Sequence, residues 1–408
     1  MSQVVGVACG LVGVRIVSHI VPPATLGVYG VFLTFTTLGA SFFHAGVVKF
    51  VGRHWARHFH EHAFVQTAAR AWLRKLPWLI LATLVAAWIL QRGQDTRFSQ
   101  AWPALLVAAI GLSLGAVAQM GLQSIRRNWS DFVVSASGSV TRTFAPPLIF
   151  LAAHGAIAGL YFGFCVHALC VSVLGILLLK PFRANDRAGV DPNLSTIYEG
   201  PLFFILSLAG WTLMGLNRWV AVTAFGETVG GYYTLAGNIA QIVAAVLGAI
   251  TVQFLQPSVY ALADEDTTEA YQRLATWVDR AAIGVAFIGG MALLVLRWGA
   301  PWLVGPLIDR KYLLALEWLV PAGCFGLTIV LGQFYHMMLL AGRRERACAP
   351  VDLTMAAVLI LGSIASAAIA KSCFQIWLLA TPLLVFALNR TMARHYYFRA
   401  KALAPASL

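Results

Sequence analysis

Two arginines stand at the same place in two similar stretches of this sequence, and each interrupts an apolar segment. RIVSHIVPPATLGVY at 15–29 and RWVAVTAFGETVGGY at 218–232 match without a gap at five positions, including both arginines. A guanidinium is a planar fork of N–H donors that matches phosphate oxygens. Arg15 and Arg218 are therefore candidate ligands for a phosphate-bearing group. The alternative is that each side chain extends (snorkels) toward the outer surface of the membrane that the chain spans.

A third arginine lies deeper in an apolar segment. Arg142 is about eleven residues into the segment 131–153, where a charged residue costs roughly 2.5–3.5 kcal/mol on insertion scales. Such a residue commonly faces a polar cavity, so Arg142 is also a candidate binding residue. The alternative is a structural bond to carbonyls that Pro146 and Pro147 leave without N–H partners.

Two amide side chains could complement these cations. Asn238 and Gln241 are spaced i,i+3 on one apolar segment, and in a cavity they could bond sugar hydroxyls. Hydrogen bonding between helices is the other interpretation. The same choice applies to the remaining polar residues of the apolar segments, which are Thr34, Thr36, Thr37, Gln119 and Ser139.

A metal centre is not indicated. His54, His58 and His62 follow one another at i,i+4 steps, a spacing that could ligate a metal on one helical face. Flanking arginines favour an amphipathic turn at the membrane surface instead. The six cysteines form no CxxC pair, so we interpret them as apolar packing residues and expect no metal and no cofactor.

The composition defines the elements that carry these residues. Hydrophobic residues make up 59% of the chain, charged residues only 11%, and the mean hydropathy is +0.76, whereas soluble domains are about 25% charged. The chain has room for roughly a dozen spans of about 20 residues. Segments that are apolar on every face exclude a barrel. We therefore predict an all-α integral membrane protein with about 12 transmembrane helices.

The expected spans fall into two sets of six. They are 4–21, 26–48, 76–91, 102–125, 131–153 and 156–179, then 200–222, 231–255, 278–296, 313–340, 350–370 and 375–392. Most Lys and Arg residues fall in connections on one side, which predicts that both termini are cytoplasmic. The net charge of +13 is largely this bias, with a contribution from attraction to membrane lipid, so we expect no nucleic-acid partner.

The repeat predicts two pseudo-symmetric six-helix lobes. We place them at 1–182 and 200–408, the second with a basic cytoplasmic tail, and a cytoplasmic hinge at 183–199. Transporters built from two such halves hold the substrate between them near mid-membrane and rock one half against the other. On this interpretation Arg15 and Arg218 would face each other across one cavity.

Several motifs resemble one known family. VPPATLGVYGVF at 21–32 is similar to the turn after the first helix of polysaccharide flippases in the multidrug/oligosaccharidyl-lipid/polysaccharide exporter superfamily, and GVVKFVGRH at 46–54 resembles the end of their second helix. The stretch 216–242 resembles their seventh and eighth helices, and 303–325 the segment before the tenth. The resemblance covers most of the chain as a pattern, but its motifs are short and degenerate.

The resemblance implies a Wzx-type flippase. Such a protein moves an undecaprenyl-pyrophosphate-linked oligosaccharide across the bacterial inner membrane for O-antigen, capsule or exopolysaccharide synthesis, and cationic residues in its cavity meet the head group. The family often has Arg at a position that falls about at His19 here, so His19 and Arg15 compete for that role. A polysaccharide polymerase and chain-length proteins are the implied partners.

Two other functions stay open. An ion-coupled multidrug exporter of the same superfamily would use an embedded carboxylate, for which Asp279 and Glu317 are the candidates. A membrane-embedded polymerase or ligase of envelope assembly would need a large external loop or a His/Asp constellation, and the sequence has neither. We therefore expect a transporter and not an enzyme.

Overall fold

The computed structural model describes residues 2–58, 62–81, 83–84, 101–179, 201–265, 267–303, 305–341 and 345–402. These residues are almost entirely helical and contain no β-strand, which confirms the predicted fold class. By length and composition, seven of the described helices could cross a membrane: Pro23–Phe42, Trp102–Ser124, Ile157–Leu179, Glu269–Trp302, Arg310–Ala341, Ala347–Ile369 and Lys371–Phe398. Val4–Ile20 is a shorter apolar helix.

A helix lies over nearly every predicted span, although several helices are up to about ten residues longer at one end than predicted. In the first half they are α1 (Ser2–Ile20), α2 (Pro23–His58), α3 (His62–Leu73), α6 (Trp102–Ser124), α7 (Asn128–Ala152) and α8 (Ile157–Leu179). In the second half they are α9 (Pro201–Phe225), α10 (Glu227–Asp264), α11 (Thr268–Leu303), α12 (Leu319–Ala341), α13 (Glu345–Ile369) and α14 (Lys371–Ala402), with the 3-10 helices η3 (Gly305–Leu307) and η4 (Arg310–Trp318) before α12. Most of the predicted span 76–91 lies outside the described residues.

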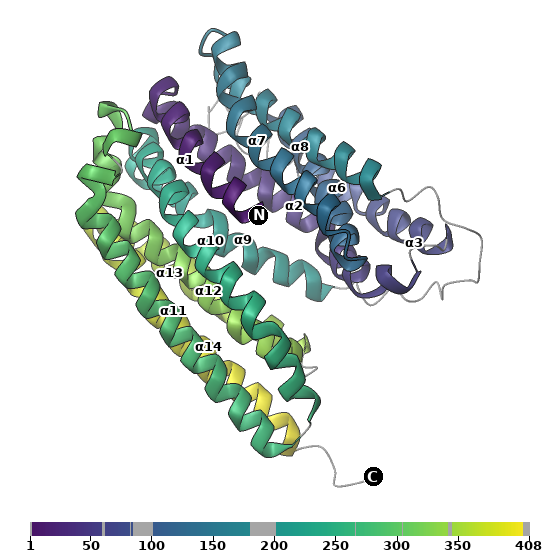
Figure 1. The fold of residues 1–408 in the computed structure, drawn as a ribbon. Helices are drawn as coiled ribbons and strands as arrows, with labels where there is room; N and C mark the ends of the chain where they lie inside the picture. The colour runs from purple at the N-terminus through teal and green to yellow at the C-terminus, as the bar shows by residue number, and fades with distance from the viewer. Residues whose placement is uncertain are drawn as a thin grey trace. The chain divides into compact units, whose positions relative to one another are not determined.

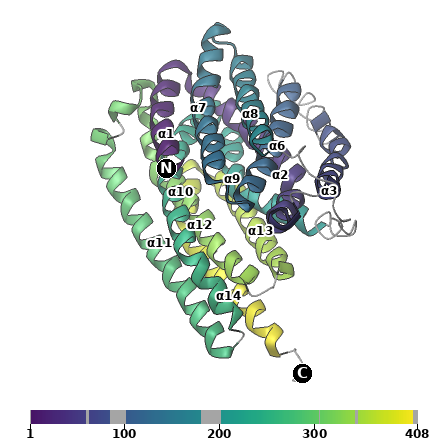
Figure 2. The same ribbon diagram turned by 45° about the vertical axis from the view of Figure 1, so that its right-hand side comes forward.

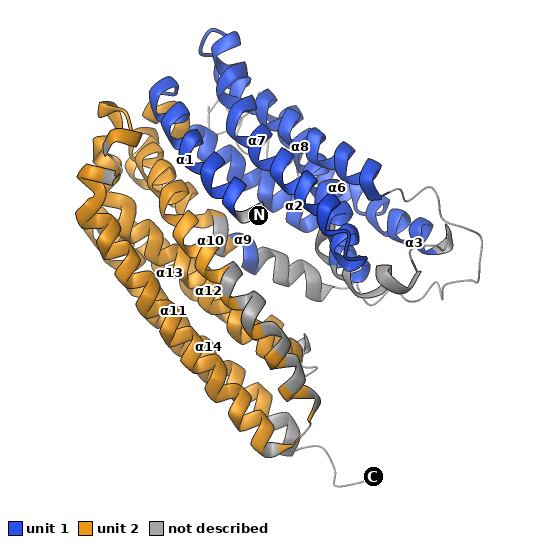
Figure 3. Cartoon of the chain, viewed as in Figure 1, with its two compact units in different colours: residues 1–21, 28–211 blue, residues 22–27, 212–408 orange. Residues whose placement is uncertain are grey.

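The chain divides into two compact units (Figure 3). One comprises residues 1–21 and 28–211, and the other 22–27 and 212–408. The division falls inside α9, after Trp211, and the second unit also takes the short segment 22–27 from the first half. The predicted hinge 183–199 lies outside the described residues, so the predicted domain boundaries stay a prediction.

Helix α8 is the packing centre of the first unit. It runs beside both α6 and α7 (Figures 1 and 2). A Cβ on Gly111 of α6 would lie 2.9 Å from the backbone of Ala168, and one on Gly115 would lie 2.8 Å from the side chain of Val171. Small residues four apart allow helix backbones to approach in this way. The Gly111-x-x-x-Gly115 sequence therefore marks a close helix contact.

Helix α7 continues through Pro146 and Pro147. Proline removes an N–H donor and crowds the preceding turn, but membrane helices tolerate it where a neighbouring helix packs closely. Here Gly163 of α8 lies directly against Pro146, and Gly159 against Phe150. The two glycines, again four residues apart, give α8 the room to cover this part of α7.

Helix α12 is the buried core of the second unit. It packs against α10, α11 and α14, and its apolar side chains are buried on all faces, the pattern expected of a helix surrounded by others. Large buried side chains of neighbouring elements lie in the same unit, among them Trp318 of η4 and Phe374 of α14. Figure 2 shows α10, α11 and α12 running side by side within this unit.

Two helix starts meet within the second unit. The first turn of α2 lies against the first turn of α10, where Gly27 contacts the carbonyl of Glu227 and Gly231 contacts the carbonyl of Pro23. The contact is reciprocal, because each glycine meets the first residue of the opposite helix. Neither glycine position leaves space for a side chain.

Candidate functional site

Arg218 is a buried cation in the second unit. It lies on α9, and only 8% of the residue is exposed. Its Nη2 donates to Asn238 Oδ1 at 2.9 Å and approaches Gln241 Oε1 at 3.4 Å. Both amides belong to α10 and lie about one turn apart on it. Three of the six predicted binding residues are therefore joined in one polar cluster, which we call the Arg218 cluster (Arg218, Asn238 and Gln241).

A tight turn explains why these residues meet. Helices α9 and α10 are separated by one residue, Gly226, whose φ of +87° lies in the left-handed region that glycine adopts without strain. Just after this turn, Gly230 packs against Val222, so the two helices start in contact. An antiparallel pair brings residues at similar distances from the turn together. Arg218 lies eight residues before Gly226 and Asn238 twelve residues after it, an offset of about one helical turn that the long arginine side chain can span.

A second buried polar group adjoins this cluster in sequence. Asn217 is 2% exposed, and its Oδ1 accepts from Ser363 Oγ at 2.8 Å. Ser363 Oγ in turn accepts from Trp377 Nε1 at 3.0 Å. These bonds link α9 to α13 and α14. Neither Asn217 nor Ser363 was among the residues predicted from the sequence, although a polar Asn next to an embedded Arg was a usable signal.

The other three predicted residues belong to the first unit. Arg15 and His19 lie one turn apart on α1, and both are exposed. Arg142 lies on α7 and is also exposed. Within the described part of the chain, Arg142 makes no hydrogen bond to the carbonyls around Pro146. Its neighbour Thr143 donates to the carbonyl of Cys9 at 3.1 Å, so this part of α7 packs against α1.

The remaining polar residues of the apolar helices are used structurally. Thr34, Thr36 and Thr37 donate to carbonyls four residues earlier in α2. Gln119 Nε2 donates to Ser135 Oγ at 2.8 Å, which joins α6 to α7. Ser139 donates to the carbonyl of Ser135 within α7. These contacts match the interpretation as hydrogen bonds within and between helices.

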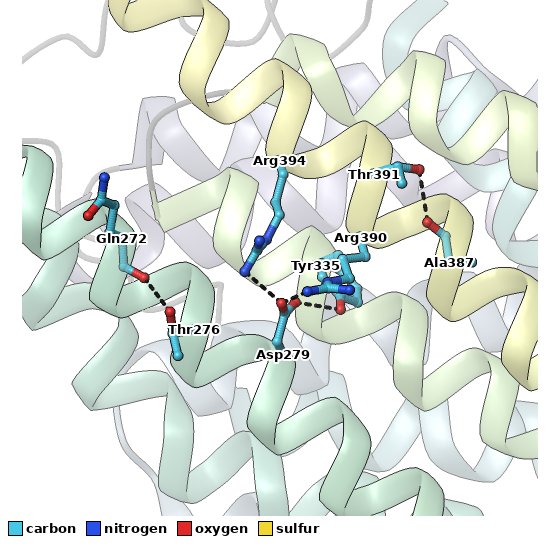
Figure 4. A network of polar contacts seen from close by, with 8 residues as sticks. All are labelled: Gln272, Thr276, Asp279, Tyr335, Ala387, Arg390, Thr391 and Arg394. Carbon is cyan, nitrogen blue, oxygen red and sulfur yellow. Dashed lines mark hydrogen bonds and ion pairs between the residues drawn. The ribbon is translucent and has the colours of Figure 1, made fainter.

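Asp279 is the centre of a second ionic cluster (Figure 4). Its Oδ2 accepts from Arg390 Nε at 2.9 Å and from Arg394 Nη2 at 2.6 Å, and its Oδ1 accepts from Tyr335 at 2.9 Å. The cluster joins α11, α12 and α14. We call these four residues the Asp279 cluster. From the sequence, Asp279 was predicted only as a candidate ion-coupling carboxylate.

The structure offers no metal site among the residues that it describes. No group of three or more His, Cys, Asp or Glu residues has a metal-binding arrangement there, and all six cysteines are free thiols. The histidine string cannot be compared, because the side chains of residues 52–63 lie outside the described part.

Comparison with known proteins identifies the fold. No protein-family profile matches the sequence, and no curated protein sequence matches it. Solved structures do match over the full length. A MATE transporter mutant from Vibrio cholerae gives a TM-score of 0.60 at 14% identity, covering 99% of this chain and 95% of that one.

Two further structures show the same likeness. An inward-facing multidrug resistance MATE family transporter of the MOP superfamily gives a TM-score of 0.54 at 13% identity, covering 100% of this chain and 96% of that one. A MOP superfamily transporter from Pyrococcus furiosus, described as having a binding pocket of reverse polarity that suggests a different function, gives 0.54 at 14% identity, covering 97% and 96%. The chain therefore has the fold of the MATE transporters.

Proposed function

We propose that the protein is a membrane exporter that moves a lipid-linked oligosaccharide, carried on undecaprenyl pyrophosphate, across the bacterial inner membrane by alternating access. The observation that carries the proposal is the burial of Arg218 on an apolar helix beside two amides. A buried guanidinium is costly in a membrane protein and is generally functional. The substrate's diphosphate is the anion that it would meet.

The partners of Arg218 suit this role. Asn238 and Gln241 are neutral, so their two hydrogen bonds orient the guanidinium without cancelling its charge. Both bonds are made by Nη2, which fixes the plane of the guanidinium. The same amides carry N–H groups that could bond sugar hydroxyls. The Arg218 cluster thus offers both charge for a diphosphate and hydrogen bonds for a sugar.

The first unit would supply the other cations. Arg15 and Arg142 are exposed on α1 and α7, two helices that pack together. His19 lies one turn beyond Arg15. We propose that these three residues bind the head group at another stage of its passage. Both termini would be cytoplasmic, and a polysaccharide polymerase and chain-length proteins would take up the exported unit.

The contacts of Asp279 and Glu317 argue against the alternative of an ion-coupled drug exporter. An ion-coupled exporter needs a carboxylate that can exchange a proton or sodium ion. Asp279 is bound by two arginines, and Glu317 Oε2 is paired with Lys371 Nζ at 3.2 Å. These cations already occupy carboxylate oxygens of both residues, so they would compete with an incoming ion. Both candidates are therefore poorly placed for ion coupling.

The fold supports transport as the general class. MATE transporters share this architecture, and the reverse polarity described for the pocket of the Pyrococcus furiosus protein is consistent with one fold serving ligands of different charge. The fold by itself does not choose the substrate. That choice rests on the Arg218 cluster.

Reconstitution tests the proposal directly. Purified protein in liposomes loaded with an undecaprenyl-pyrophosphate-linked oligosaccharide should expose the sugar to an external glycosidase over time. Arg218→Gln should slow exposure by at least about tenfold, equivalent to roughly 1.4 kcal/mol. Arg297→Gln, which removes an exposed arginine at the end of α11, is the matched control.

Two results would contradict the proposal. One is sugar exposure by Arg218→Gln at the rate of the control variant, with equal amounts of folded protein in the liposomes. The other is efflux of cationic dyes from the same vesicles without any sugar exposure, which would favour the multidrug exporter.

A further inference from the structure

The side chains of α11 mark the level of the membrane in the second unit. Trp277 is 50% exposed near one end of the helix, and Trp298 and Trp302 are 76% and 82% exposed near the other. Tryptophan gathers at membrane–water interfaces. Trp277 and Trp298 are 21 residues apart, or about 32 Å along a helix, which matches a hydrocarbon core of about 30 Å.

The surface of α11 between these tryptophans is apolar. Its exposed side chains there include Ile283, Phe287, Met291 and Leu294. This is the face expected of a helix in contact with lipid chains. Asp279 follows Trp277 by two residues, so the Asp279 cluster lies at the level of one membrane interface, where lipid phosphates are found.

The Asp279 cluster carries an excess of positive charge. One carboxylate faces two guanidinium groups, and both donate to the same oxygen, Oδ2. The other oxygen, Oδ1, accepts from Tyr335. Three hydrogen bonds thus occupy the carboxylate, while each arginine has one bond in the cluster out of five possible donors. The cluster therefore has a net charge of +1, and its arginines have several N–H groups that make no bond within the cluster.

The arginines remain accessible although the carboxylate is not. The side chain of Asp279 is 9% exposed, whereas those of Arg390 and Arg394 are 47% and 34% exposed. Among the described residues, the buried Nε of Arg394 has no hydrogen-bond partner. Figure 4 shows both arginines reaching Asp279 from α14. The carboxylate is therefore shielded, whereas the two arginine side chains can be reached from outside the protein.

We propose that Arg390 and Arg394 bind the phosphate of an anionic phospholipid at this interface. The guanidinium fork matches phosphate oxygens, and basic sites between transmembrane helices bind anionic lipid head groups. Asp279 and Tyr335 position the two arginines. Exposed Arg273 and Arg280 on α11 add positive charge at the same end, while Glu269 lies ten residues before Asp279, about 15 Å farther out along the helix.

Thermal unfolding in detergent with added lipid tests this site. Phosphatidylglycerol should raise the Tm of the wild-type protein by roughly 3 °C more than phosphatidylcholine does, because choline neutralises the phosphate charge. Inorganic phosphate at the same phosphate concentration should have no effect. Stabilisation by inorganic phosphate equal to that by the lipid would overturn the assignment to a lipid.

Three variants separate binding from a structural role. Arg394→Gln should raise the half-saturating phosphatidylglycerol concentration by at least about fivefold. Asp279→Asn should lower it, because the arginines are then no longer neutralised by the carboxylate. Lys371→Gln, which removes an exposed cation from the other end of α14, should not change it.

The opposite signs make the test decisive even where a variant is less stable. A purely structural ion pair would lower the Tm in both Arg394→Gln and Asp279→Asn, and neither change would alter the response to lipid. That result would overturn the proposal. Equal responses of the wild-type protein to phosphatidylglycerol and phosphatidylcholine would do the same.

Discussion

Gly27 lies directly against Gly231, so that a Cβ on Gly27 would be 3.0 Å from the amide nitrogen of Gly231. The two glycines hold equivalent places in the reciprocal contact between the starts of α2 and α10. Each faces the carbonyl oxygen of the other helix's first residue, Glu227 or Pro23. The contact joins backbone to backbone, so no side chain can rotate away to make room.

Alanine at either glycine should therefore destabilise the protein. Overpacking costs about 1–3 kcal/mol in ordinary cores, and we expect Gly27→Ala and Gly231→Ala to reach the upper part of that range. Gly237→Ala on the same α10 helix is the control, because nothing lies within 4 Å of its Cβ position. Thermal unfolding of the purified variants measures the difference. Equal stability of the Gly231 and Gly237 variants would show that the contact is not tight.

The reciprocal contact also changes how the two halves correspond. It pairs Pro23 with Glu227 and Gly27 with Gly231, one residue away from the sequence match that pairs Arg15 with Arg218. The last backbone bonds before the turns run from Val21 to Val17 and from Gly226 to Val222. Arg15 lies two residues before Val17, the acceptor of the first bond, whereas Arg218 lies four residues before Val222, the acceptor of the second.

Two residues correspond to about 200° around a helix. Arg15 and Arg218 thus occupy different faces of their helices, in agreement with the exposure of Arg15 and the burial of Arg218. The ungapped sequence match could not reveal this, because the second turn is one residue shorter than the first. The repeat in sequence located the two turns, but it carries no information on helix rotation.

The fold was predictable because hydropathy alone selects membrane helices. Long apolar runs must satisfy their backbone groups internally, so α8 and α12 are helices almost regardless of their neighbours. The Asp279 cluster was not predictable in the same way. Asp279 and Arg390 are 111 residues apart, and only the packing of α11 beside α14 brings them together. Polar partners depend on helix rotation, which hydropathy does not define.

Within the Arg218 cluster, Asn238 should matter more than Gln241. The bond from Arg218 to Asn238 is 2.9 Å long, whereas the one to Gln241 is 3.4 Å and close to the limit of a useful hydrogen bond. Removing a good acceptor from a buried charge costs about 1–3 kcal/mol. We expect Asn238→Leu to lower the free energy of unfolding by an amount in this range, and Gln241→Leu to lower it by less than about 1 kcal/mol. Both variants alter the same helix, so unfolding measurements can compare them directly. A larger loss of stability in Gln241→Leu than in Asn238→Leu would contradict the geometry.

The contact between α7 and α8 should be sensitive to one methyl group. A Cβ on Gly163 would enter the space of Pro146 and the carbonyl of Ala145, and the proline ring cannot move aside. We expect Gly163→Ala to cost about 1–3 kcal/mol. Gly6→Ala on α1 is the control, since its nearest neighbour, Ser139 Oγ, would be 3.7 Å away. Equal melting temperatures for the two variants would show that α7 and α8 are not packed at Pro146 as the structure has them.

Neutralising Glu317 distinguishes a head-group exporter from an ion-coupled one. The side chains of Glu317 and Lys371 are 49% and 44% exposed, and exposed ion pairs contribute about 0–1 kcal/mol. Glu317→Gln should therefore leave both the unfolding free energy and the rate of sugar exposure nearly unchanged, within about twofold, and the rate should respond to an imposed pH or sodium gradient as the wild-type rate does. A coupling carboxylate behaves differently, because transport stops, or becomes independent of the gradient, when it can no longer exchange its ion. Loss of transport in Glu317→Gln at normal stability would assign Glu317 to ion coupling and would favour the multidrug exporter as the function.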